Sequence, residues 1–159
     1  MRLVLDTNVV IDWLVFDDPF LATFRAQVLS GQVTVMTHPP ALEELRRVLG
    51  YRELKLDEAR RASVLERYES QTKPATRAFA EGEGLQPSLP KQFPRCRDPD
   101  DNHFLALAFH SKADALVSRD NEVLVLARRA RKFGFEILNV PQMAEAVARR
   151  AANAAAPGT

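Results

Sequence analysis

Four acidic side chains in this sequence could meet in the folded chain and hold a divalent cation. They are Asp6, Glu44, Asp101 and Asp120. Carboxylates that lie close together repel one another, so either some of them take up protons or a cation neutralises them. A ligand set made only of oxygen atoms favours hard cations such as Mg²⁺ or Mn²⁺. Mg²⁺ in such sites usually acts on phosphate esters, where it polarises a phosphoryl oxygen and lowers the pKa of a bound water.

Softer metal ligands do not suggest a different kind of site. The sequence has one cysteine, Cys96, and its histidines, His38, His103 and His110, show no metal-ligand spacing with that cysteine. A single cysteine also excludes an internal disulfide framework and a cysteine-rich zinc or iron–sulfur site. The expected cofactor is therefore Mg²⁺ or Mn²⁺ held by carboxylates.

Helix periodicity selects one acid from each of two neighbouring pairs. At about 100° per residue, Asp101 shares a helical face with apolar residues at i+3, i+4 and i+7, whereas Asp100 lies at the flank. By the same reasoning, Glu44 borders the apolar face of its helix and Glu43 points into water. We therefore expect Asp101 and Glu44, and not their neighbours, to reach the site.

Each acid also has a purely structural explanation. Asp98 before Pro99 is typical of a helix start, with Asp98 as the N-cap and with Asp100 and Asp101 facing the positive end of that helix. Asp120 could cap the following helix, and Asp6 could form a turn after a buried strand. No single acid decides between these explanations. The functional signal is the set of four acids within one pattern of alternating strands and helices.

Apolar runs and turn residues predict the elements that must position these acids. Strands are expected at 3–5, 33–37, 115–118 and 136–140, and helices at 20–29, 39–49, 57–70, 98–109, 121–132 and from 141 onward. Alternating strands and helices favour a parallel sheet with helices on both faces. In such sheets, ligands bind beyond the carboxyl ends of the strands, near a switch in strand order.

Length and composition fit a single globular domain. The chain has 159 residues, of which 46% are hydrophobic and 27% charged, and its net charge is +1. This balance excludes a polybasic nucleic-acid coat, so any contact with nucleic acid must come from local clusters of charge. No apolar run approaches the ~18 residues that span a bilayer, and Asp6 comes too early for a signal peptide. We expect a cytoplasmic protein that does not contact a membrane.

Four motifs resemble those of the PIN-domain ribonucleases, and most closely the VapC-like toxins of bacterial toxin–antitoxin pairs. They are LDTNVVI at residues 5–11, LEEL at 42–45, DPDDNHFLALA at 98–108 and VSRD at 117–120. The resemblance implies a three-layer α/β/α sandwich with a central parallel sheet of four to five strands. It also implies an Mg²⁺- or Mn²⁺-dependent endoribonuclease, the toxin of a type II pair, which hydrolyses RNA to leave a 5′-phosphate.

The resemblance also assigns roles to individual residues. The acidic set of the family falls on Asp6, Glu44, Asp101 and Asp120, which are the expected catalytic residues and metal ligands. Supporting polar residues are expected at Asn8 and Ser118, further acids at Asp98 and Glu122, and contacts to RNA phosphates at Arg119 and Arg97.

The resemblance extends over residues 1–143, which we expect to form the nuclease domain. Within them, the Pro-rich stretch 72–97 does not align and is expected to be a connection or flap, whereas 144–159 is expected to be an Ala-rich helix end and tail. Expected partners are the RNA substrate, a cognate antitoxin and a second copy of the chain.

Other functional classes fit the sequence less well. A receiver-type regulatory domain also binds Mg²⁺, but it needs a pair of acids after the first strand and a lysine after the last, where this chain has Asp6 alone and Val140-Pro141. A phosphatase of the haloacid type needs a second Asp where Asn8 stands. A non-catalytic PIN-like scaffold that binds only RNA or protein remains an alternative, against which the intact acidic set argues.

Overall fold

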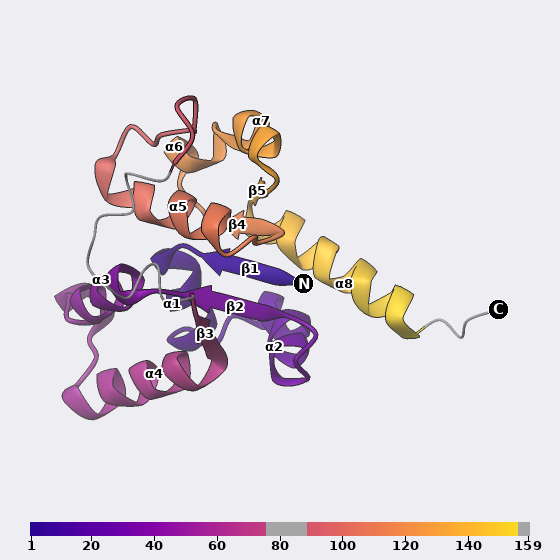
Figure 1. The fold of residues 1–159 in the computed structure, drawn as a ribbon. Coiled ribbons are helices and arrows are strands. Elements are labelled where there is room, and N and C mark those ends of the chain that lie inside the picture. Colours follow the sequence, from indigo (N-terminus) through magenta and orange to yellow (C-terminus); the bar gives the residue numbers. More distant parts are fainter. Residues whose placement is uncertain (76–88, 156–159) are drawn as a thin grey trace.

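A five-stranded parallel sheet forms the centre of the molecule, and helices cover both of its faces (Figure 1). The structure is a computed structural model that describes residues 1–75 and 89–155. The strands are β1 (Arg2–Leu5), β2 (Thr34–Thr37), β3 (Thr72–Pro74), β4 (Ala115–Val117) and β5 (Glu136–Leu138). They are ordered β3-β2-β1-β4-β5, and every neighbouring pair is parallel. The predicted α/β/α sandwich is thereby confirmed.

Side chains along the central strand alternate between two hydrophobic clusters. Leu3 and Leu5 pack into one cluster and Val4 into the other, and all three are buried. In β4, Leu116 packs on the same side as Val4, because β1 and β4 run in register from Leu3 opposite Ala115. Strand positions that are buried on both faces are apolar, which explains why residues 3–5 of β1 form a continuous apolar run after the exposed Arg2.

Eight α-helices within the described residues surround the sheet. They are α1 (Thr7–Leu14), α2 (Ala22–Leu29), α3 (Pro39–Leu49), α4 (Glu58–Gln71), α5 (Asn102–His110), α6 (Asn121–Leu124), α7 (Ala127–Ala130) and α8 (Val140–Ala155). Side chains of α1, α2, α4 and α8 contribute to the cluster around Leu3, and those of α5, α6 and α7 to the cluster around Val4. None of the helices in the described part of the chain is long and apolar enough to cross a membrane.

The structure differs from the sequence-based expectation in several elements. Helix α1 occupies residues for which no helix was expected, and the strand expected at 136–140 ends at Leu138, because Val140 already begins α8. Strand β3 lies inside the stretch 72–97, where a connection was expected, and Thr72 pairs with Val35 of β2. The rest of the expected flap is described only from residue 89 onward, and residues 76–88 lie outside the described part of the chain. The helix expected from 98 begins instead as a 3₁₀ turn, Pro99–Asp101, and the one expected at 121–132 is divided into α6, α7 and a second 3₁₀ turn, Arg131–Phe133.

Strand order places a switch point next to β1. The chain moves outward from β1 through β2 to β3, and then crosses to the other side of β1 to form β4 and β5. Leu5 pairs with Val117, and the Asp6 amide continues this pairing by donating a hydrogen bond to the Val117 carbonyl at 2.9 Å. Residues that follow β1 and β4 therefore meet at the carboxyl edge of the sheet, where such folds bind ligands.

Candidate functional site

Asp6 lies at the junction between β1 and α1, and it is only 5% exposed. Its Oδ1 accepts a hydrogen bond from the Asn8 amide at 3.0 Å, which caps α1. Its Oδ2 accepts a hydrogen bond of 2.6 Å from the Ser118 hydroxyl. Burial raises the pKa of the Asp6 carboxyl despite these two hydrogen bonds, and the charges of Glu44 and Asp120 raise it further. Asp6 thus combines the capping role with a place in an acidic cluster.

Asp101 ends the 3₁₀ turn that precedes α5, and its carboxylate does not cap the helix. The hydrogen bond that its side chain accepts comes from the Cys96 thiol, at a distance of 3.8 Å. Burial raises the pKa of Asp101 to about 6, and the charges of Asp6, Asp120, Asp98 and Glu44 act in the same direction. Asp98 instead caps the turn by accepting from the Asp100 amide at 3.0 Å. The capping explanation therefore holds for Asp98 and not for Asp101.

Glu44 lies in the middle of α3, and its side chain is only 16% exposed. Its Oε1 accepts a 2.7 Å hydrogen bond from the Thr7 hydroxyl, and its Oε2 lies 2.8 Å from His103 Nε2. Burial opposes ionisation of this carboxyl, but the hydrogen bonds from His103 and Thr7 outweigh it and hold the pKa of Glu44 below its ordinary value. The neighbouring Glu43 is exposed and pairs with Arg46, as helix periodicity predicts.

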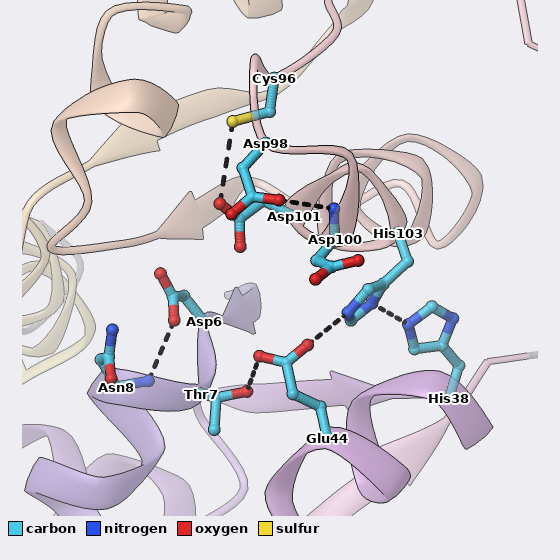
Figure 2. A network of polar contacts seen from close by, with 10 residues as sticks. All are labelled: Asp6, Thr7, Asn8, His38, Glu44, Cys96, Asp98, Asp100, Asp101 and His103. Carbon is cyan, nitrogen blue, oxygen red and sulfur yellow. Dashed lines mark hydrogen bonds and ion pairs between the residues drawn. The ribbon is translucent and has the colours of Figure 1, made fainter. Parts of the chain in front are cut away.

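Three of these acids point into one space from separate elements (Figure 2). Asp6 comes from the end of β1, Asp101 from the turn before α5, and Glu44 from α3. The fourth, Asp120, follows β4 and accepts a 2.8 Å hydrogen bond from the Glu122 amide at the start of α6. Its own amide donates to the Ser118 hydroxyl at 3.0 Å, so that Ser118 links Asp120 to Asp6.

Other residues expected at the site lie around its edge. Asn8 is exposed and contributes its backbone amide to Asp6, and Glu122 is exposed on α6. Arg119 is exposed, and its Nη1 donates to both carboxylate oxygens of Asp12, at 2.9 and 2.8 Å. Arg97 is exposed on the loop before Asp98. The acidic centre is therefore surrounded by exposed residues that carry both positive and negative charges, and we call these residues the rim.

Three residues at the site were not expected from the sequence. Thr7 and His103 hold the two oxygens of Glu44, and His38 lies behind His103 with its Nε2 at 2.9 Å from His103 Nδ1. His38 directly follows β2, just as Asp6 follows β1. A search for every polar residue that follows a strand, rather than for acids alone, would have found His38.

The chemistry of the acidic centre fits Mg²⁺ or Mn²⁺. Across residues 1–75 and 89–155, no three histidine, cysteine or acidic side chains form a ready-made metal-binding group. The carboxylates nevertheless lie close enough for the charges of Asp6, Asp120 and Glu44 to raise the pKa of Asp101. A hard cation that takes oxygen ligands suits this set, because Mg²⁺ usually keeps several waters and uses one or two carboxylates rather than a closed protein cage.

A cavity of about 350 Å³ opens beside the acidic centre. It is lined by Pro40, Glu43, Glu44, Arg47, Asp100 and His103. Glu44 and His103 thus belong both to the wall of this cavity and to the network around the acids, and Arg47 places a positive charge within the same cavity. A substrate that carries negative charge could therefore lie next to the carboxylates.

Comparison with known families assigns most of the chain. The family model of the PIN domain matches residues 2–122, which include all four acids and the three residues that orient Glu44 and His103. Comparison with curated proteins and with solved structures finds no match for this chain. The matched segment begins with β1 and extends into α6, so it covers the whole carboxyl-edge site described above. The chain belongs to the PIN-domain family.

Proposed function

We propose that this protein is a divalent-metal-dependent endoribonuclease. The observation that carries the proposal is the convergence of Asp6, Glu44, Asp101 and Asp120 at the switch point of the sheet. In the described part of the chain, no lysine or arginine forms an ion pair with Asp6, Asp101 or Asp120. Acids that share a site without cationic partners are typical of metal-dependent catalysis and costly for structure alone.

In this proposal the four acids would hold Mg²⁺ or Mn²⁺. When bound, such a cation supplies Lewis-acid stabilisation to the phosphodiester as negative charge develops, and it lowers the pKa of a water. Ser118 orients Asp6 through a 2.6 Å hydrogen bond, and Thr7 orients Glu44 through one of 2.7 Å. A water that attacks the phosphorus in line with the leaving 3′-oxygen would then give a product with a 5′-phosphate.

RNA is the proposed substrate, and exposed arginines at the rim are its proposed contacts. Arg119 and Arg97 would pair with phosphates on either side of the scissile bond, because both are exposed and each directly precedes an acid of the proposed site in the sequence. Arg119 precedes Asp120, and Arg97 precedes Asp98. Asp12 fixes the Arg119 guanidinium at the end of α1. Arg47 in the neighbouring cavity would offer a third phosphate contact.

The biological role that we propose is that of the toxin in a type II toxin–antitoxin pair. The support for this role is the VapC-like form of the four sequence motifs, within the match to the PIN family. A cognate antitoxin, a homodimeric state and a cytoplasmic location belong to the same proposal. Induced expression would then arrest growth, co-expression of a small protein from the neighbouring reading frame would relieve the arrest, and the Asp101→Asn chain would not cause it.

A cleavage assay tests the biochemical proposal. Purified protein is incubated with single-stranded RNA and with DNA of the same sequence, in Mg²⁺, in Mn²⁺ and in EDTA. Cleavage of RNA that depends on the metal and leaves 5′-phosphate ends is expected. The Asp101→Asn variant, purified in the same way, controls for contaminating ribonuclease. Binding of RNA without cleavage would favour the scaffold alternative, and undiminished cleavage in EDTA would contradict the metal mechanism.

A further inference from the structure

A pair of histidines lies directly behind Glu44, on the side away from Thr7 (Figure 2). His103 belongs to the first turn of α5, and His38 joins β2 to α3. The two rings have centroids 5.0 Å apart, and their nitrogens are in hydrogen-bond contact at 2.9 Å. His38 is 2% exposed, so its ring is fixed within the protein. Thr7, Glu44, His103 and His38 therefore form one continuous chain of hydrogen bonds.

The direction of these hydrogen bonds follows from the chemistry of the groups. An ionised carboxylate can only accept, so His103 Nε2 carries the proton that faces Glu44. This leaves His103 Nδ1 to interact with His38. Burial lowers the pKa of His38 to about 3, which keeps that ring neutral at physiological pH. A neutral ring has one donor and one acceptor nitrogen, so His38 can complement His103 without adding a second charge.

Both carboxylate oxygens of Glu44 accept a hydrogen bond, and each has capacity to accept a second. Each carboxylate oxygen has two acceptor sites. Thr7 takes one on Oε1 and His103 takes one on Oε2, at 2.7 and 2.8 Å. The remaining site on each oxygen is left for another ligand. Because both of its oxygens accept hydrogen bonds, the Glu44 side chain has already lost torsional freedom in the folded protein. Less of that freedom remains to be lost when a cation binds.

We propose that His103 is a positioning residue that holds Glu44 in the orientation needed for cation binding, and that His38 holds the His103 ring in turn. This inference rests on the proposed metal-dependent function and adds two residues to it. It also gives a role to His103, which lines the same cavity as Glu44 and Arg47. Outer residues of this kind commonly change metal affinity by about 10- to 100-fold when they are removed.

The test measures binding of Mn²⁺ alone, without RNA. The measured quantity is the Mn²⁺ concentration that produces half of the rise in melting temperature seen at the highest Mn²⁺ concentration used. This Mn²⁺ midpoint is compared among the parent, His103→Phe, His103→Gln and His38→Phe. Phenylalanine keeps a ring and removes the donor, whereas glutamine restores an N–H donor close to the position of Nε2. His110→Gln is the matched control, because His110 ends the same helix and lies outside the hydrogen-bond chain to Glu44.

We expect His103→Phe to raise the Mn²⁺ midpoint by about tenfold, and His103→Gln to recover most of that loss. His38→Phe should raise it by about threefold, because it acts one step further from the carboxylate. In cleavage assays the same variants should shift the Mn²⁺ concentration for half-maximal rate more than the rate at saturating Mn²⁺. A residue with only a packing role would not be rescued by glutamine.

Several outcomes would overturn the inference. It fails if His103→Phe keeps the midpoint of the parent, or if His103→Gln binds Mn²⁺ as poorly as His103→Phe. If His103→Phe does not fold, His103→Gln and His38→Phe decide the matter, and a parental midpoint for His38→Phe contradicts the proposed chain. A parent that shows no response to Mn²⁺ contradicts the metal-dependent function itself and the inference together, so the two failures can be told apart.

Discussion

Asp114 and Asp6 lie at opposite edges of the same sheet, and their surroundings differ. Asp114 precedes β4 at the amino edge, where it accepts from the Arg2 amide at 2.7 Å and pairs with Arg150 at 3.4 Å. Asp6 follows β1 at the carboxyl edge, where the carboxylates of Glu44 and Asp120 raise its pKa. At the amino edge an acidic side chain is therefore paired with a basic one, whereas at the carboxyl edge several acidic side chains lie close together.

Under the proposed function, this difference distinguishes an edge arranged for stability from one arranged for chemistry. Paired charges at a surface stabilise a fold by a modest amount, and they need no ligand to do so. Buried acids that repel one another cost stability, and such a cost is usually retained only where function requires it. The five predictions below test this contrast and run from the largest expected effect to the smallest.

Catalysis should depend on the carboxyl edge alone. Asp101→Asn and Glu44→Gln should each reduce the rate of RNA cleavage by at least about tenfold, which corresponds to roughly 1.4 kcal/mol of barrier. Asp114→Asn at the amino edge is the matched control and should retain the parental rate. Steady-state cleavage of one defined RNA by the three variants checks this prediction. Equal losses at both edges would remove the contrast.

Stability should change in opposite directions at the two edges. In EDTA, Asp101→Asn should raise the melting temperature by a few degrees, because it removes a half-buried charge whose pKa is raised by burial and by neighbouring carboxylates. Asp114→Asn should lower it by about 2 °C or less, because a partly exposed ion pair is lost. Thermal melts of both variants beside the parent measure the two signs.

In Mg²⁺ the parent should melt at a higher temperature than Asp101→Asn, which reverses the order expected in EDTA. The parent should gain stability in millimolar Mg²⁺, because the cation binds the folded state, and Asp101→Asn should gain less. Equal gains in both proteins would mean that Asp101 does not help to bind the cation.

The metal-free protein should lose stability as the pH rises through about 6. Asp101 has a pKa of about 6 in the folded chain, against an ordinary value of 3.8. Between these values the folded state binds the proton more strongly than the unfolded state, so its stabilising effect is complete below the lower value and is lost above the higher one. Melts in EDTA from about pH 4.5 to about pH 7.5 should therefore show a growing advantage of Asp101→Asn over the parent. A constant difference would contradict the raised pKa.

Glu43→Gln should have the smallest effect of all. Glu43 is exposed and pairs with Arg46, whereas its neighbour Glu44 turns toward Thr7 and His103. Cleavage by this variant should stay within about twofold of the parent, because Glu43 lies at the exposed side of the neighbouring cavity and is not one of the proposed cation ligands. A large loss would show that α3 presents the wrong acid in the proposed site.

The sheet could be predicted where burial alone determines the sequence pattern. Strand β1 is a run of apolar residues because both of its faces are covered. Strand β3 could not be found in this way. It has three residues, it ends in Pro74 at the sheet edge, and only Thr72 is buried, so no pattern marks it. Its existence depends on pairing with β2, which is a long-range property.

The candidate site was predictable in its acids and not in the contacts that orient them. Helix periodicity distinguishes Glu44 from Glu43, because the side on which a residue lies is a local property. The contact of Glu44 with His103 joins residues 59 positions apart, and it depends on how α3 packs beside α5. Local patterns do not contain that information, and so His38 and His103 were not connected with the site.

The central position of β1 has a consequence for how the protein is made. Strand β1 pairs with β2 and β4, and the Asp6 carboxylate accepts from Ser118, which lies 112 positions later in the chain. Contacts of such long separation form slowly, because a large loop must close before they gain any stabilising energy. A nascent chain that ends before β4 carries Asp6, Glu44 and Asp101 but lacks Ser118 and Asp120. The proposed metal site is therefore complete only after synthesis has passed Asp120 and β4 has joined the sheet.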